Sequence, residues 1–189
     1  MQSPFWKSIN DQNKLKDDFM NVLSACSVHN IGIIVLPLVD NGSIDNPDQF
    51  DCLKSFLLSI IPNLISSNVK IAFESDLCPN LLSDFIKEFP RECFGINYDI
   101  GNSASLGFDP NHELNFYSDR IINVHIKDRL YQGSTVPLGT GNANLPLVFS
   151  LLNSSGYSGN YILQAARSST GQHSELISDY INYILPLVS

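Results

Sequence analysis

Short apolar segments alternate with amphipathic ones along this chain, and the alternation limits the fold more than any other feature. Five apolar segments have the composition of buried strands: residues 31–36, 69–74, 94–99, 121–126 and 161–164. Helical spacing of apolar residues falls between and around them: residues 15–28, 50–64 and 80–89, a short helix beginning at 110, then 145–153 and 174–185. Strands separated by helices pair in parallel through right-handed crossovers. The sequence therefore predicts an α/β fold with outer helices.

Composition excludes several classes of function. The 189 residues suit a single domain, 1–189, and 43% of them are hydrophobic. Because the net charge is −8 and phosphate contacts dominate nucleic-acid affinity, no nucleic-acid partner is expected. No apolar run reaches the roughly 18 residues of a membrane span, so no membrane association is expected. The chain has no signal-peptide pattern, and its four cysteines are scattered, which favours reduced thiols and a cytoplasmic location.

Four strands are predicted to end on a polar side chain of the same orientation. Glu74, Asp99, His125 and Gln164 hold these positions, with 25 residues from Glu74 to Asp99 and 26 from Asp99 to His125. Active sites of parallel sheets lie at the carboxyl ends of the strands. Two carboxylates, an imidazole and an amide oxygen suit a divalent cation. Each residue also has a purely structural explanation. Glu74 and Asp99 could cap helices, His125 could bond a backbone carbonyl, and Gln164 could simply occupy space at the end of its strand.

The residues around these positions resemble the sugar-phosphate isomerase/epimerase family of xylose isomerase-like TIM barrels. The matching stretches cover most of residues 31–167: Leu36-Pro-Leu-Val-Asp40, Ala72-Phe-Glu74, Gly95-Ile-Asn-Tyr-Asp-Ile-Gly-Asn102, Val124-His-Ile-Lys-Asp128, Leu138-Gly-Thr-Gly141 and Gly156-Tyr-Ser-Gly-Asn-Tyr-Ile-Leu-Gln164. The resemblance implies metal ligation by Glu74, Asp99, His125 and Gln164 with Mn, Mg, Co or Zn. It also makes Glu74 the acid/base.

The resemblance further implies that Lys127 and Asp128 lie near a small sugar or sugar-phosphate substrate. Asn102 and Arg167 are additional candidates for binding that substrate, although a turn residue and an exposed cap explain them equally well. The loop with Gly139 and Gly141 is a weaker candidate for binding phosphate, because no Lys-Ser/Thr follows it.

The chain departs from the family pattern in two ways. Gln164 stands where the family has a second glutamate, and an amide can bind a metal but carries no proton. A one-base isomerisation therefore fits better than a symmetric two-base epimerisation. The second departure is length, because an eight-stranded barrel typically needs about 250 residues. We expect an incomplete TIM-barrel-like sheet that lacks the first βα units, with residues 31–36 as an edge strand and homo-oligomer formation through this open barrel edge.

Three functions agree with these patterns to different degrees. The first is a metal-dependent isomerase or epimerase, in which the metal polarises a carbonyl and Glu74 moves a neighbouring proton. The second is a non-catalytic or degenerate family member that binds a sugar or a protein partner. The third, an apurinic-site endonuclease of the same fold, is disfavoured by the negative charge and by the small number of histidines.

Overall fold

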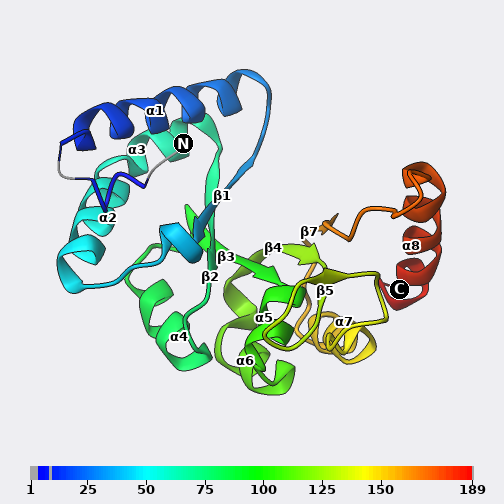
Figure 1. The fold of residues 1–189 in the computed structure, drawn as a ribbon. Coiled ribbons are helices and arrows are strands. Elements are labelled where there is room, and N and C mark those ends of the chain that lie inside the picture. Colours follow the sequence, from blue (N-terminus) through cyan, green and yellow to red (C-terminus); the bar gives the residue numbers. More distant parts are fainter. Residues whose placement is uncertain (1–3, 9, 189) are drawn as a thin grey trace. The chain divides into compact units, whose positions relative to one another are not determined.

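The computed structural model describes residues 4–8 and 10–188, and its strands form a parallel sheet (Figure 1). Neighbouring strands follow the order β1-β2-β3-β4-β7, and the registers of β1 with β2, β2 with β3 and β4 with β7 are parallel. This arrangement confirms the predicted α/β class. The strands are β1 (Ile33–Leu38), β2 (Lys70–Ser75), β3 (Phe94–Asp99), β4 (Ile121–Ile126) and β7 (Asn160–Leu163). A small antiparallel pair, not predicted, joins β5 (Asp128–Arg129) to β6 (Thr135–Val136).

Helices connect the strands, as the alternation predicts. They are α1 (Gln12–Val28), α2 (Pro47–Ser59), α3 (Ile61–Ser67), α4 (Pro79–Lys87), α5 (Ile100–Leu106), α6 (Pro110–Tyr117), α7 (Leu145–Ser154) and α8 (His173–Val188). Two short 3-10 turns, η1 (Asp40–Gly42) and η2 (Ser118–Arg120), complete the list. The short helix predicted to begin at 110 is confirmed, and Asp109 caps it, because its carboxylate accepts the backbone N–H of Asn111 at 3.0 Å.

Two helical predictions were wrong in detail. The single helix predicted over 50–64 is two helices, because Pro62 has no N–H to donate and its ring disfavours the preceding helical turn. Residues 100–103, which lie outside every helix predicted above, are the start of α5. Its Gly-Asn-Ser composition is typical of a turn, but the Asp99 carboxylate caps the helix by accepting the backbone N–H of Asn102.

The chain packs as two compact units, and the boundary between them falls inside β3. The first unit takes in the described residues up to Asp76 together with 84–96. Four aromatic rings form much of its core, with centroids 4.9–5.9 Å apart around Phe73 of β2: Phe73, Phe85, Phe89 and Phe94. Aromatic side chains bury a large apolar area, so this cluster anchors β2 beneath α4.

Strand β1 is an edge strand, as predicted, since among the described strands it pairs only with β2. The bond from the Lys70 backbone N–H to the Gly32 carbonyl sets the register, so Ile33, Val35 and Pro37 turn their backbone groups away from β2. Pro37 is tolerated inside the strand because the N–H that it lacks would face the open edge.

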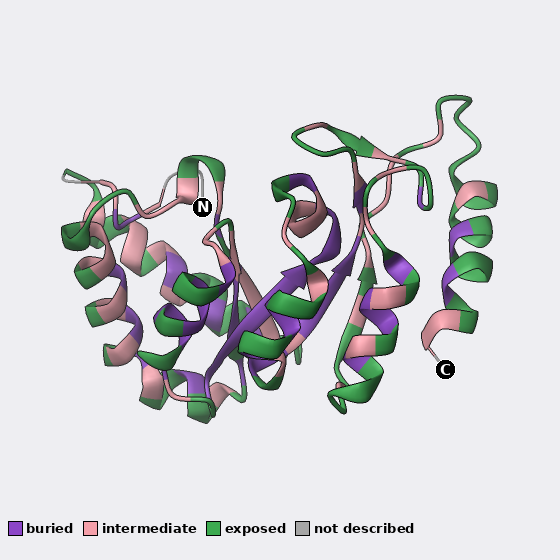
Figure 2. Cartoon of the chain, turned by 90° about the horizontal axis from the view of Figure 1, so that it is seen from below, coloured by how far each residue is buried: buried purple, intermediate pink, exposed green. Residues whose placement is uncertain are grey.

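The second unit comprises residues 77–83 and the described residues from Asn97 onward. Val124 of β4 is 0% exposed, and Phe149 and Leu152 of α7 are equally buried. Figure 2 shows the central strands β3 and β4 mostly buried, whereas the helices carry exposed residues along one side. This core holds the carboxyl ends of β3 and β4 in fixed positions. In the described part of the chain, no helix is long and apolar enough to cross a membrane.

Candidate metal centre

Asp99 and His125 meet within the second unit, where β3 and β4 end. The His125 Nδ1 atom lies 3.8 Å from the Asp99 Oδ2 atom. Only 4% of Asp99 and 9% of His125 is exposed. The prediction that polar side chains at the ends of these strands share one orientation therefore holds for this pair.

The two oxygens of Asp99 have different partners. Oδ1 accepts the backbone N–H of Asn102 at 2.9 Å, while Oδ2 accepts a hydrogen bond from the Lys127 ammonium at 3.0 Å. Burial alone would raise the pKa of Asp99, but hydrogen bonds from His125, Lys127 and the Asn102 backbone bring the pKa below its ordinary value. Asp99 is consequently an anion at neutral pH, as a metal ligand must be.

A chain of buried amides orients the imidazole. Asn123 donates through Nδ2 to Asn97 Oδ1 at 2.6 Å, and Asn97 Nδ2 lies 3.1 Å from His125 Nδ1. Asn97 and Asn123 are 2% and 4% exposed. Alternation along β3 and β4 puts them on the same face as Asp99 and His125, but alternation does not reveal this contact. The only sequence signal is an asparagine two positions before each of the two ligand candidates.

Lys127 reaches Asp99 because the second residue of α5 is a glycine, Gly101. A Cβ atom at Gly101 would lie 2.7 Å from Lys127 Cγ and 2.9 Å from its Cβ and Cδ. Real Cβ atoms do not come this close, so the lysine stem passes over the first turn of α5 only where residue 101 has no side chain. The structure therefore brings Lys127 to the site, beside Asp99.

Asp128, predicted to contact substrate, is 0% exposed and binds a loop of its own chain. Its Oδ2 atom accepts the backbone N–H groups of Gly139 at 2.9 Å and Gly141 at 2.8 Å, and Oδ1 accepts that of Ala143 at 3.0 Å. A Cβ at Gly141 would lie 2.1 Å from Oδ1, so the loop needs glycine there. The glycine loop considered for phosphate thus directs these two glycine N–H groups at Asp128.

Asn102 and Arg129 contact each other through a side-chain hydrogen bond. Arg129 donates through Nη1 to Asn102 Oδ1 at 2.9 Å, and through Nε and Nη2 to the Gly133 carbonyl. Asn102 is half-buried at the start of α5, close in sequence to Asp99. The structure therefore places Asn102 next to the candidate site and gives its side-chain oxygen a partner within the chain.

Gln164 follows β7, and its backbone N–H donates to the Ile126 carbonyl at 2.9 Å. The parallel register aligns Gln164 with Lys127, because Ile126 pairs with Leu163. The Gln164 side chain is exposed and lines a cavity of about 600 Å³ between the end of β7 and α8. Arg167 and His173 line the same cavity, so the structure places Gln164 and Arg167 together in one solvent-accessible cavity.

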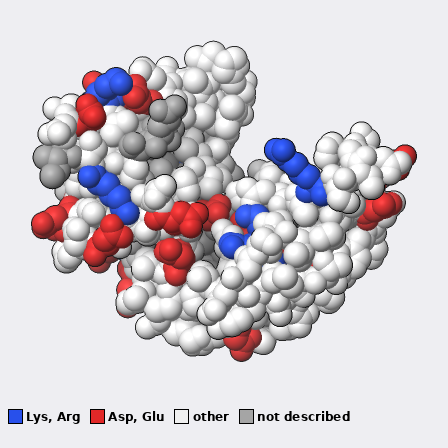
Figure 3. Space-filling model, viewed as in Figure 1, with Lys and Arg blue, Asp and Glu red and all other residues white. Residues whose placement is uncertain are grey.

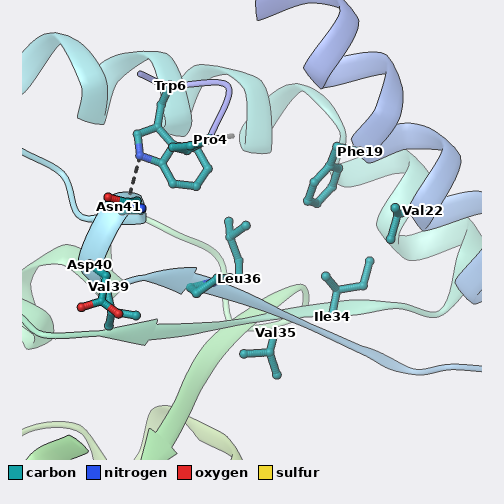
Figure 4. A pocket seen from close by; sticks show the side chains of 12 residues that line it. Pro4, Trp6, Phe19, Val22, Ile34, Val35, Leu36, Val39, Asp40 and Asn41 are labelled. Carbon is teal, nitrogen blue, oxygen red and sulfur yellow. Dashed lines mark hydrogen bonds between the residues drawn. The ribbon is translucent and has the colours of Figure 1, made fainter. Parts of the chain in front are cut away.

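Glu74 belongs to the first unit and is half-buried near the end of β2, in register with Pro37 of β1. The first unit also has a cavity of about 440 Å³, which the β1 residues Ile34 and Leu36 help to line (Figure 4). Its walls are mostly apolar, and the Trp6 indole N–H donates to the Gly42 carbonyl at 3.2 Å. It offers little polar chemistry apart from Asp40 at its rim.

The donor atoms fit a divalent cation in chemical type. An ionised carboxylate and an imidazole face each other in a buried setting, and both are common ligands of transition metals. Asp99 and His125 both belong to the second unit, whereas Glu74 belongs to the first. On the face drawn in Figure 3, the basic side chains of the described residues form no continuous patch.

Comparison with solved structures identifies the same fold. A xylose isomerase domain protein from Planctomyces limnophilus is 18% identical, with a TM-score of 0.80, and the match covers 96% of this chain and 68% of that one. The IOLI protein, solved with a bound zinc atom, is 18% identical with a TM-score of 0.79, covering 98% and 73%. A D-tagatose 3-epimerase-like protein is 20% identical with a TM-score of 0.72, covering 99% and 76%.

At such identities these structures establish the fold, whereas the family rests on a match of sequence. No curated protein matches the chain. The family model described as the xylose isomerase-like TIM barrel matches residues 6–183. This match spans both units, all five strands of the parallel sheet and every strand-end residue discussed above. The chain therefore belongs to the xylose isomerase-like TIM barrel family.

Proposed function

We propose that this protein is a metal-dependent isomerase or epimerase of sugars or sugar phosphates. The observation that carries the proposal is the buried pair of Asp99 and His125, 3.8 Å apart at the carboxyl ends of neighbouring strands. In barrels of this architecture, catalytic residues come from that end of the strands. The D-tagatose 3-epimerase-like protein among the similar structures supports a sugar as the substrate class.

The proposed ligands are Glu74, Asp99, His125 and Gln164. The first three offer two carboxylate oxygens and an imidazole nitrogen, and Gln164 would add a neutral amide oxygen. This set suits Mn, Mg, Co or Zn, and the zinc atom in the IOLI protein supports a divalent ion. Because one ligand is neutral, we expect weaker metal binding than in a site with three carboxylates.

The proposed reaction divides the work among the residues of this chain. When bound, the metal would polarise the substrate carbonyl and its neighbouring hydroxyl. Glu74 takes a proton from the carbon beside the carbonyl and returns it to the carbonyl carbon, while the proton of the neighbouring hydroxyl passes to the former carbonyl oxygen. Lys127, with Asn102 and Arg167, would bind substrate oxygens. Since Gln164 cannot carry a proton, one base acting on one face of the substrate is the mechanism that we favour.

Deuterium incorporation tests this proposal across a panel of candidate sugars. Proton transfer next to a carbonyl exchanges that hydrogen with solvent, so aldoses, ketoses and their phosphates should gain deuterium in D₂O when Mn²⁺ is present. Glu74→Gln should abolish the exchange, because it removes the base and one anionic ligand while leaving the fold intact. The control Glu88→Gln removes a surface carboxylate that pairs with Lys54 and should leave the exchange unchanged. Full exchange in EDTA, or in Glu74→Gln, would refute the mechanism.

Two observations favour a second function, a sugar-binding protein without catalysis. Gln164 replaces a potential base with an amide, and the Asp99 oxygens both accept hydrogen bonds from within the chain. A protein of this kind would bind sugar without exchanging its hydrogens. Metal analysis of the purified protein separates the two possibilities, since the enzyme should retain a divalent ion in stoichiometric amount and the binding protein should not.

A further inference from the structure

The Asp99 Oδ2 atom already has a cation beside it, and that cation belongs to the protein. The Lys127 ammonium lies 3.0 Å from this oxygen, and His125 Nδ1 lies 3.8 Å from the same atom. The side chain of Lys127 is 15% exposed and that of Asp99 is 1% exposed, so the ion pair is shielded from solvent. Shielding strengthens the attraction between unlike charges far above its value in water.

Neighbouring residues keep Lys127 in this position. The aliphatic stem of Lys127 lies against Gly101. Because the contact is so close, no larger residue fits at position 101. The nearest other cation in sequence, Arg129, is directed elsewhere, since it donates to Asn102 and to the Gly133 carbonyl. Lys127 is therefore the counter-ion that the fold supplies to Asp99 Oδ2.

We infer that Lys127 competes with the divalent cation for Asp99, and thereby sets the metal affinity of the site. This inference rests on the proposed function, because it assumes that Asp99 is a metal ligand. An ammonium and a divalent ion cannot both lie within contact of one buried oxygen without strong repulsion. Loading of the metal must therefore move the lysine away from Asp99.

The displaced lysine has a consequence for substrate. Once it leaves Asp99, the ammonium has three donors and a flexible four-carbon stem, and it remains at the end of β4 beside the site. A hydroxyl oxygen of a bound sugar, or an anionic oxygen of its phosphate, would then be its natural partner. Binding of metal thus makes Lys127 available to the substrate, and metal and substrate should each strengthen binding of the other.

Calorimetric titration with Mn²⁺ tests the competition directly. Lys127→Met removes the competing charge and keeps the length of the stem, so it should bind Mn²⁺ on the order of tenfold more tightly than the wild type. Lys127→Arg keeps the charge and should stay near the wild-type affinity. The control Lys87→Met removes a surface lysine that pairs with Asp84, and it should leave the affinity unchanged. Lys127→Gln repeats the test with a polar side chain if the methionine variant does not fold.

Chemical labelling of lysines reports on the movement itself. Reductive methylation, followed by mass spectrometry, should modify Lys127 more slowly than Lys87 without metal, and saturation with Mn²⁺ should accelerate the labelling of Lys127 alone. Equal Mn²⁺ affinity in Lys127→Met, Lys127→Gln and the wild type, or unchanged labelling on saturation, would overturn the inference while leaving the proposed function in place. Absence of Mn²⁺ binding in all of these proteins would overturn both.

Discussion

Glu113 is a buried carboxyl with hydroxyl groups on three sides. It accepts hydrogen bonds from Tyr98 at 2.9 Å, Ser103 at 2.7 Å and Tyr117 at 2.8 Å, and it is 1% exposed. Burial raises the pKa of Glu113, and the three hydroxyl donors only partly offset that effect. The cluster ties α5, α6 and β3 together beside the helix that Asp99 caps. Because its pKa is raised, Glu113 keeps its proton to a higher pH than an exposed glutamate does.

The raised pKa of Glu113 predicts a pH dependence of stability. Since the folded pKa lies above the unfolded value near 4.5, the contribution of Glu113 to stability is fully present below that value and is lost as pH rises through the folded pKa. Glu113→Gln removes this titration. The free energy of unfolding in urea should therefore be similar for the two proteins at acidic pH, and the variant should gain relative to the wild type towards neutral pH. A constant difference across the pH range would contradict the assignment.

The sequence predicted the positions of some site residues but not the partners of others. Asp99 and His125 follow from alternation along strands that end at the same edge, and the structure brings them together. The partners of Lys127 and Asp128 were not predictable, because they depend on side-chain paths over Gly101 and on loop amides at Gly139. Sequence spacing gives the orientation of a residue on its strand but does not identify which neighbour it contacts.

At the scale of elements, hydrophobic periodicity predicted the strands closely. β3 and β4 have the predicted bounds, and β1, β2 and β7 are shifted by one or two residues. The errors concern helices whose composition is ambiguous. Pro62 divides one apolar stripe into α2 and α3, and a side-chain cap at Asp99 turns a Gly-Asn-Ser segment into α5. Both depend on single residues that override the average character of a segment.

The loop between β6 and α7 depends on hydrogen bonds to Asp128, so changing Asp128 should lower the stability of the protein. Asp128→Asn replaces one accepting oxygen with an amide group that faces a backbone N–H, so the free energy of unfolding should fall by about 1–3 kcal/mol. Hydrogen exchange at Gly139, Gly141 and Ala143 should become faster. Asp84→Asn alters only a surface ion pair and should change stability by less than about 0.5 kcal/mol. Equal losses in both variants would show that Asp128 does not hold the loop.

At the scale of the whole molecule, the sheet has two open ends in the described chain. β1 pairs only with β2, and β7 only with β4. Pro37 protects the edge of β1, because a strand cannot pair fully with a neighbour that lacks an N–H. The β7 side has no such residue and is followed by exposed apolar side chains on α8: Ile177, Ile181 and Leu185. Their spacing places them along one face of the helix.

Exposure of this α8 face predicts self-association. Apolar stripes of this kind rarely remain uncovered in water, so light scattering during size-exclusion chromatography should show a mass that rises with protein concentration. The double change Ile177→Lys and Ile181→Lys should shift the protein towards the monomer. Leu81→Lys alters an equally exposed side chain on α4 and should not. A monomer at every concentration in the wild type would contradict the prediction.

The central claim is that Asp99 and His125 bind a catalytic divalent ion. Pulsed electron paramagnetic resonance of the Mn²⁺-loaded protein tests it most directly, because it detects nitrogen atoms coordinated to the ion. With ¹⁵N-labelled histidine, we expect coupling to one imidazole nitrogen in the wild type, and loss of that coupling in His125→Gln. His112→Gln, which changes a histidine that packs against Phe116 on α6, should retain the coupling. Coupling that persists in His125→Gln, or its absence from the wild type, would contradict the account.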